Sequence, residues 1–244
     1  MMNSAVKIAA VADIHSPRYL QLYLQALRGI HDKPDVLIWV GDIVDKNNVE
    51  AITPVYEATR KHLEECPIIA VFGNEEYRGF EEKYIEKTPG VLWINDEIRI
   101  LTVNEIRIGF IGTRGALDKP TPWQQKNMPW LLNYYKELPQ RIIDLARNAR
   151  NDVDKLVLIS HYGVTRRNLR GENPRVWPYL ASTGMEKIIK TGLFDLVIHG
   201  HAHKASIERI DLYGTPVYNV SLPGRKKITL INVSARKGLL QWIR

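Results

Sequence analysis

Short apolar segments alternate with amphipathic ones over the first third of this chain. VKIAAVAD, DVLIWVGD and PIIAVFGN are continuous apolar runs of strand length, and apolar-periodic segments at 19–30 and 49–65 separate them. A strand that is apolar on both faces belongs in a parallel sheet whose two faces are covered. The alternation therefore restricts the amino-terminal third to an α/β arrangement.

The rest of the chain adds strands on both sides of a helical region. The helical region is 123–151, with Pro129 and Pro139 as points of interruption. The strand-like segments are GVLWI, IRILTV, IRIGFIGT, KLVLISH, DLVIHGHAH and the carboxyl-terminal ASIERID, TPVYNVSL, KITLINV and LLQWIR, with a helix at 185–190. We therefore expect an α/β fold of two packed, mixed β-sheets flanked by helices.

Length and composition limit the class of protein. A chain of 244 residues suits one domain, taken as 1–244. No apolar run reaches the roughly 20 residues that cross a bilayer, and MMNSAVKIAAVAD lacks the pattern of a signal peptide. Cys66 is the single cysteine, so we expect a reducing, cytoplasmic location and no membrane. The net charge of +7 favours anionic partners, which could be nucleic acid, phosphorylated metabolites or acidic surfaces.

Polar residues follow five of the predicted strands, each time at the carboxyl end. The clusters are Asp13-Ile14-His15, Gly41-Asp42-Ile43-Val44-Asp45, Gly73-Asn74-Glu75-Glu76, His161 and His199-Gly200-His201-Ala202-His203. Ligands of open α/β sheets bind at the carboxyl ends of the strands. Each cluster alone has a structural explanation, such as a helix cap or a turn. Their joint occurrence predicts one shared site.

The chemistry of these side chains indicates a metal centre. Imidazole, carboxylate and amide groups suit Mn²⁺, Fe²⁺ or Zn²⁺, with Ni²⁺ as a further alternative and Mn²⁺ preferred in vitro. A carboxylate such as Asp42 has two oxygens and can bridge two ions. The predicted ligands are Asp13, His15, Asp42, Asn74, His161, His201 and His203.

In this order, Asp-x-His, Gly-Asp-x-x-Asp, Gly-Asn-x-Glu, a lone strand-end His and Gly-His-x-His resemble the calcineurin-like metallophosphoesterases, from about Ala9 to Lys204. The resemblance implies a four-layer α-β-β-α sandwich. It implies that one metal ion is held by Asp13, His15 and His203, and the second by Asn74, His161 and His201. Asp42 would bridge them, Asp45 would support the ligands or cap a helix, and Lys46 would contact phosphate.

One position departs from the family pattern. Most relatives have Gly-Asn-His-Glu or Gly-Asn-His-Asp, whose histidine helps to protonate the leaving group, and this chain has Glu75 there. Glu75 would serve as an acid of raised pKa, pair with an arginine or mark weakened catalysis, and these alternatives stay open. Asn74, Glu75 and His161 are the candidate catalytic residues.

A basic segment, YGVTRRNLRGENPRVWPYL, directly follows His161. It is either a solvated loop or a substrate lip. In the second interpretation Arg166 and Arg167 bind a second phosphate or a polyanion, and Trp177 and Tyr179 stack on the substrate.

The resemblance implies hydrolysis of phosphate esters, diesters more than monoesters, by a hydroxide that bridges two divalent ions. The expected partner is a small phosphate ester, with nucleic acid as an alternative. The rival hypothesis, favoured by Glu75, is a weakly active or inactive binding or scaffold module of the same fold.

Overall fold

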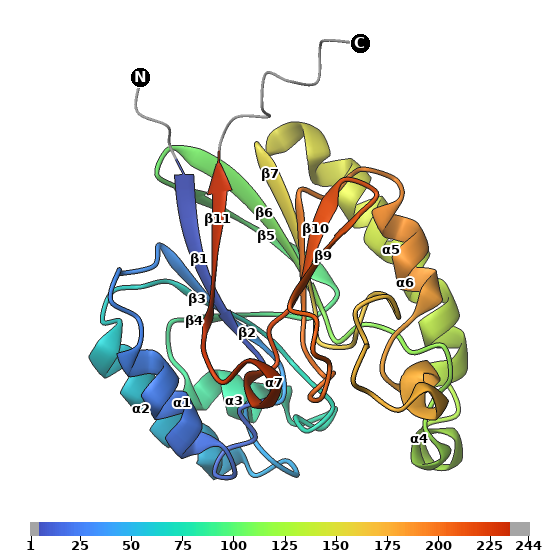
Figure 1. Ribbon diagram of the computed structural model, residues 1–244, viewed down its shortest axis with the longest axis horizontal. Helices are drawn as coiled ribbons and strands as arrows, with labels where there is room; N and C mark the ends of the chain where they lie inside the picture. The colour runs from blue at the N-terminus through green and yellow to red at the C-terminus, as the bar shows by residue number, and fades with distance from the viewer. Residues whose placement is uncertain (1–4, 235–244) are drawn as a thin grey trace.

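Two β-sheets pack face to face in the computed structural model, which describes residues 5–234 (Figure 1). The first sheet has the order β11-β1-β2-β3-β4. Its strands are β1 (Ala5–Val11), β2 (Val36–Val40), β3 (Ile68–Val71), β4 (Val91–Ile94) and β11 (Thr229–Ser234). Strands β1 to β4 are parallel, and β11 runs antiparallel beside β1.

The second sheet has the order β5-β6-β7-β8-β10-β9. Its strands are β5 (Glu97–Val103), β6 (Ile106–Thr113), β7 (Lys155–Ser160), β8 (Leu196–His199), β9 (Arg209–Leu212) and β10 (Thr215–Asn219). The four inner strands are parallel, and the edge strands β5 and β9 are antiparallel to their neighbours.

Helices cover the outer face of each sheet (Figure 1). On the first sheet lie α1 (Leu20–Arg28), α2 (Thr53–His62) and α3 (Glu81–Lys87), and a 3₁₀ turn, η1 (Val49–Ile52), precedes α2. On the second lie α5 (Leu131–Ala149) and α6 (Thr183–Ile189). The remaining short helices are α4 (Pro122–Asn127), α7 (Leu222–Arg225), η2 (Arg150–Asp152) and η3 (Pro174–Tyr179).

Alternation of side chains along the buried strands explains the layers. In β1, Ile8 and Ala10 point into the core between the sheets, while Ala9 and Val11 point toward α1 and α2. A strand apolar on both faces can serve two cores at once. The predicted α-β-β-α sandwich of two mixed sheets is therefore confirmed.

The prolines of the helical region behave differently from each other. Pro129 lies between α4 and α5, as expected for a residue that interrupts a helix. Pro139 lies inside α5, and the helix continues through it. The buried face of α5, which includes Tyr135, Leu138 and Ile142, packs on the second sheet and offsets the cost of about 3 kcal/mol for an internal proline. The interruption predicted at Pro139 was wrong.

Two further expectations concern the pairing of the middle strands and the last predicted strand. The segment GVLWI forms β4, which runs parallel to β3, whereas β5 and β6 pair antiparallel, so this part of the chain is mixed. The predicted strand LLQWIR lies outside the described residues. Within residues 5–234, no helix combines the length and apolar character that crossing a membrane requires.

Candidate metal centre

Strand ends from both sheets meet at one place. Asp13 and His15 follow β1, Asp42 follows β2 and Asn74 follows β3, all from the first sheet. The second sheet supplies three residues, His161 after β7 and His201 and His203 after β8. Because these strands run parallel within each sheet, their carboxyl ends lie on the same edge.

Four of these residues form a first cluster, consisting of Asp13, His15, Asp42 and His203. One potential ligand atom from each lies within 4.8 Å of all the others. His203 Nε2 is 3.3 Å from Asp13 Oδ1 and 3.4 Å from His15 Nε2, and His15 Nε2 is 3.7 Å from Asp42 Oδ2.

Asp42 also belongs to a second cluster, with His161 and His201. Asp42 Oδ2 lies 3.4 Å from His161 Nε2, and Asn74 Oδ1 lies 3.1 Å from the same nitrogen. The two clusters therefore share one carboxylate, which is the arrangement that two neighbouring ions require.

The donor atoms of the second cluster fit a bound cation. His161 Nδ1 lies 2.9 Å from the carbonyl oxygen of Val40, so a proton on Nδ1 turns the lone pair of Nε2 toward the cluster. In that tautomer Nε2 faces the oxygens of Asp42 and Asn74, and three acceptor atoms converge. Such a convergence needs a proton or a metal ion between the atoms. His201 Nδ1 is also buried, and it lacks a hydrogen-bond partner within residues 5–234.

The electrostatics of the protein without metal agree with this geometry. Burial alone would lower the pKa of His161, but the Asp42 carboxylate raises it to about 9. The pKa of Asp42 is lowered, since the charge of His161 outweighs burial. Burial lowers the pKa of His201 to about 3, so this imidazole is neutral and able to act as a ligand.

Backbone conformation at the strand ends is unusual. Asp13, His15, Asp42 and His201 have φ values of 60°, 43°, 52° and 67°, in the left-handed region that non-glycine residues rarely adopt. Such residues persist where surrounding contacts hold them, most often at functional sites. Here the side chain of Asp13 provides one of these contacts, because its Oδ2 accepts the backbone N–H of His201 at 2.9 Å.

Glu76 is a residue whose role the sequence reasoning missed. Its buried carboxylate accepts four backbone N–H groups, from Asp42, Ile43, Val44 and Gly73. It thus joins the loops after β2 and β3, which carry Asp42 and Asn74. Burial and the charge of Asp42 raise the pKa of Glu76 to about 7. The signal that could have identified Glu76 is the glutamate of the Gly-Asn-x-Glu motif.

A family model described as calcineurin-like phosphoesterase matches residues 6–205. The chain belongs to this family. The match includes all seven predicted ligands, and the family is one of metal-dependent phosphoesterases. No curated protein matches the sequence.

Solved structures share the calcineurin-like phosphoesterase fold at low sequence identity. The protein TT1561 of Thermus thermophilus is similar with a TM-score of 0.58 and 12% identity, over 96% of this chain and 100% of that one. A putative 5′-nucleotidase from Staphylococcus aureus has a TM-score of 0.57 and 14% identity, over 95% of this chain and 51% of its own. GAP50, the anchor in the inner membrane complex of Plasmodium, has a TM-score of 0.54 and 13% identity, over 98% of this chain and 87% of its own. At these identities the likeness shows the fold.

Glu75 lies beside the candidate metal centre of this calcineurin-like phosphoesterase. Its carboxylate accepts the backbone N–H of Lys46 at 2.6 Å and the side-chain amide of Asn74 at 3.2 Å. None of the ion pairs within residues 5–234 includes Glu75. Of the three alternatives, pairing with an arginine therefore has no support in the described structure.

The structure does not bring Arg166 and Arg167 to the site. Arg166 pairs with Asp118 at 2.6 Å, and Arg167 pairs with Glu186 at 2.9 Å and lies over the ring of Tyr213. Neither arginine lines the cavities beside the clusters. Their predicted contact with substrate phosphate is thus unsupported by their placement, because acidic partners from distant segments hold both side chains elsewhere.

Other cationic side chains surround the candidate metal centre. A cavity of about 380 Å³ opens over both clusters, and its rim includes Arg18, Lys46 and Lys204, all exposed. Lys46, the predicted phosphate contact, is therefore in reach of a ligand in this cavity. Asp45 also lines this cavity, with Oδ1 at 3.4 Å from His15 Nδ1 and Oδ2 at 3.0 Å from Arg18.

Proposed function

We propose that this chain hydrolyses phosphate esters, more specifically phosphodiesters, with two divalent metal ions. One ion would be held by Asp13, His15 and His203, the other by Asn74, His161 and His201, with Asp42 shared. Bound there, the ions would act as Lewis acids and lower the pKa of water to near 7. The observation that carries the proposal is the position of Asp42 between the two clusters.

The side chains of the protein orient these groups and attract the substrate. The carbonyl of Val40 fixes the ring of His161, and Asp13 fixes the backbone of His201. The exposed ammonium and guanidinium groups of Lys46, Lys204 and Arg18 place positive charge around the cavity, which draws an anionic ester toward the clusters. A set of nitrogen and oxygen ligands without sulfur is consistent with Mn²⁺, Fe²⁺, Zn²⁺ or Ni²⁺.

The test is metal content together with hydrolysis of bis-p-nitrophenyl phosphate in the presence of Mn²⁺. Loss of a residue that only supports a metal ligand costs about 10–100-fold in activity, so loss of a ligand should cost at least about 100-fold. We expect that loss in kcat/KM for Asp42→Asn and for His161→Ala. The exposed residues Asp144 and His62 provide the matched controls Asp144→Asn and His62→Ala, which should keep the wild-type rate. Near-normal turnover in Asp42→Asn would refute the proposal.

Glu75 favours a second candidate, a weakly active or inactive scaffold. The fold is shared with a protein described as an anchor, GAP50 of Plasmodium, at 13% identity. A scaffold would bind metal without turnover of any diester, whereas a hydrolase must show both metal binding and turnover.

A nuclease is a narrower form of the proposed hydrolase. Assays on single-stranded and double-stranded DNA would separate a nuclease from an esterase of small molecules.

A further inference from the structure

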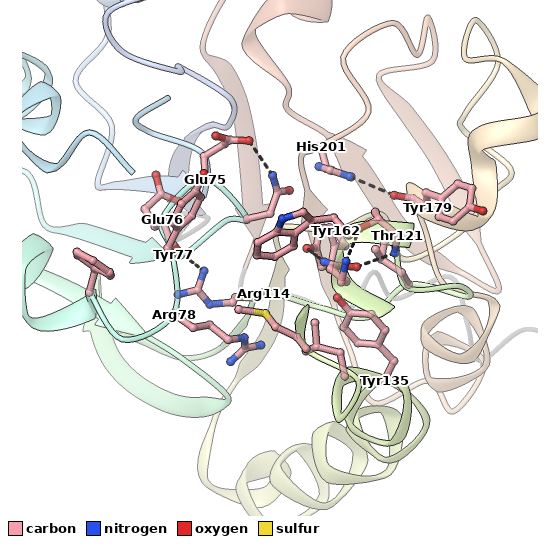
Figure 2. A pocket seen from close by; sticks show the side chains of 17 residues that line it. Glu75, Glu76, Tyr77, Arg78, Arg114, Thr121, Tyr135, Tyr162, Tyr179 and His201 are labelled. Atoms are coloured by element: carbon pink, nitrogen blue, oxygen red, sulfur yellow. Dashed lines mark hydrogen bonds between the residues drawn. The ribbon is translucent and has the colours of Figure 1, made fainter. Parts of the chain in front are cut away.

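A second cavity, of about 480 Å³, adjoins the candidate metal centre (Figure 2). Asn74, Glu75 and His201 line both this cavity and the cavity over the clusters. A molecule whose phosphate lies at the clusters would therefore have direct access to the second cavity. Its volume falls within the range of about 300–1,000 Å³ that is typical of small-molecule sites.

The walls of this cavity carry an unusual number of rings. Tyr135, Tyr162 and Tyr179 line one side (Figure 2). Trp123 on α4 and Met128 at the end of α4 also line it, and Trp123 is 60% exposed. An exposed indole at the wall of a cavity is costly to leave in water, and it becomes favourable when an apolar ligand covers it.

Ring contacts connect the metal centre to the interior of the cavity. The ring of Tyr162 lies 4.8 Å from that of His201 and 5.3 Å from that of His161, between centroids. Tyr135 meets Tyr162 edge-on at 6.2 Å. These are distances at which aromatic groups attract each other, so a further ring could extend the same series.

Several of the polar groups in the walls already have partners. Thr121 and Gln124 bond to each other in a capping box, and the side-chain amide of Gln124 donates to the hydroxyl of Tyr162 at 3.2 Å. Arg114 donates to the carbonyl oxygens of Gly73 and Glu76 and pairs with Glu81. Arg114 Nε is buried without a hydrogen-bond partner in residues 5–234, and Arg78 also lines the cavity. Thr121, Gln124 and the hydroxyl of Tyr162 are occupied, so the walls around α4 present mainly ring faces and aliphatic groups, which favour an apolar ligand over a sugar or a peptide.

We propose that this cavity binds a planar aromatic group of the phosphate ester and so determines which esters the chain accepts. The inference rests on the proposed function, because it places the phosphate of the ester at the clusters. Trp123 and Tyr135 would pack against the faces and edges of the ring, while Asn74 and His201 mark the passage to the metal centre.

The experiment is isothermal titration calorimetry with two phosphonates, in the presence of Mn²⁺. The probes are 1-naphthylmethylphosphonate and methylphosphonate, which differ in the ring and have no phosphate-ester bond to break. Binding thus reports on the cavity without any influence of the leaving group. We expect the naphthyl compound to bind at least about tenfold more tightly, the size of effect produced by a stacked aromatic contact.

Two variants test whether the tighter binding of the naphthyl compound arises in this cavity. Trp123→Ala removes an exposed ring, and Met128→Trp reduces the free volume of the cavity. Each should abolish most of the preference for the naphthyl compound and leave the affinity for methylphosphonate unchanged. Tyr213→Ala is the control, because Tyr213 is 48% exposed and lines neither cavity.

The outcomes separate this inference from the proposed function. If methylphosphonate binds and the naphthyl group adds no affinity, the aromatic site is wrong and the metal centre stands. If the naphthyl compound binds through Trp123 with the same affinity in EDTA as in Mn²⁺, the metal centre is wrong and the aromatic site stands. Binding of neither probe overturns both. An equal loss of preference in Tyr213→Ala would also overturn the aromatic site.

Discussion

Glu76 supports the loops of the candidate metal centre, although it binds no ion in the proposed scheme. Each of its carboxylate oxygens accepts two backbone N–H groups, at 2.7 to 3.1 Å. The acceptors are buried, so water does not replace them. The geometry of Asp42 therefore depends on a side chain in a different loop.

Replacing Glu76 by glutamine tests this dependence. The amide NH₂ of glutamine would face two of the four N–H donors, and both would lose their acceptor. A buried donor without a partner costs about 1–3 kcal/mol, so Glu76→Gln should lower the free energy of unfolding by about 2 kcal/mol or more. Denaturant unfolding in EDTA measures this loss. Glu86→Gln, at an exposed position of α3, is the control, and an equal loss in both variants would contradict the assigned role.

The position of Glu75 provides a test of leaving-group protonation, because most of the family has a histidine there. Without the histidine found in most of the family, poor leaving groups should be expelled slowly, so we expect faster hydrolysis of p-nitrophenyl than of alkyl phosphodiesters. Glu75→His should narrow this ratio by raising the alkyl rate at least about tenfold, which is less than the about 10²–10⁴-fold that a well-placed general acid contributes. Glu75→Gln removes the charge without adding an acid and should leave the ratio unchanged. Comparable rates on p-nitrophenyl and alkyl phosphodiesters in the wild type would contradict the expected dependence on the leaving group.

At the scale of elements, the ends of the strands position the ligands, and glycines make the close approach possible. Gly41, at the end of β2, has φ of +80°, and a Cβ there would lie 2.6 Å from His161 Nδ1. Gly79 has a similar φ of +88°, and within residues 5–234 no heavy atom outside Gly79 and its two chain neighbours would lie within 4 Å of a Cβ there. An alanine would therefore be strained at either position, but only at Gly41 would it also be crowded.

We expect Gly41→Ala to lower the affinity for Mn²⁺ at least about tenfold, because the new methyl group displaces His161. Gly79→Ala should cost about 1–2 kcal/mol in stability, through strain alone, with unchanged metal affinity. Calorimetric titration with Mn²⁺ and denaturant unfolding give both quantities. Equal metal affinities in the two variants would contradict the proposed packing.

Much of the element order was predictable, since each buried strand is a short apolar run bounded by turn residues. The convergence of the polar clusters was also predictable, because parallel strands end on one edge. The continuation of α5 through Pro139 was not predictable from the sequence. The packing that outweighs the cost of this proline involves residues distant in sequence. The same reason applies to Arg166, whose partner is Asp118, 48 positions earlier in the chain (166 − 118 = 48). Local sequence does not contain such partners.

On the scale of the whole molecule, the candidate metal centre exists only when both sheets are packed. The first sheet contributes Asp13, His15, Asp42 and Asn74, and the second contributes His161, His201 and His203. The core between the sheets sets the distance between these two groups. Binding of metal would therefore stabilise the contact between the sheets, since ions that bind only the folded state add to its stability.

Anomalous X-ray scattering from crystals grown with Mn²⁺ tests the central claim most directly. The account predicts two peaks per chain, about 3.5–4 Å apart, with the carboxylate of Asp42 between them. One peak should contact His15 and His203, and the other His161 and His201. Absence of metal, or ions bound away from Asp42, would contradict the account.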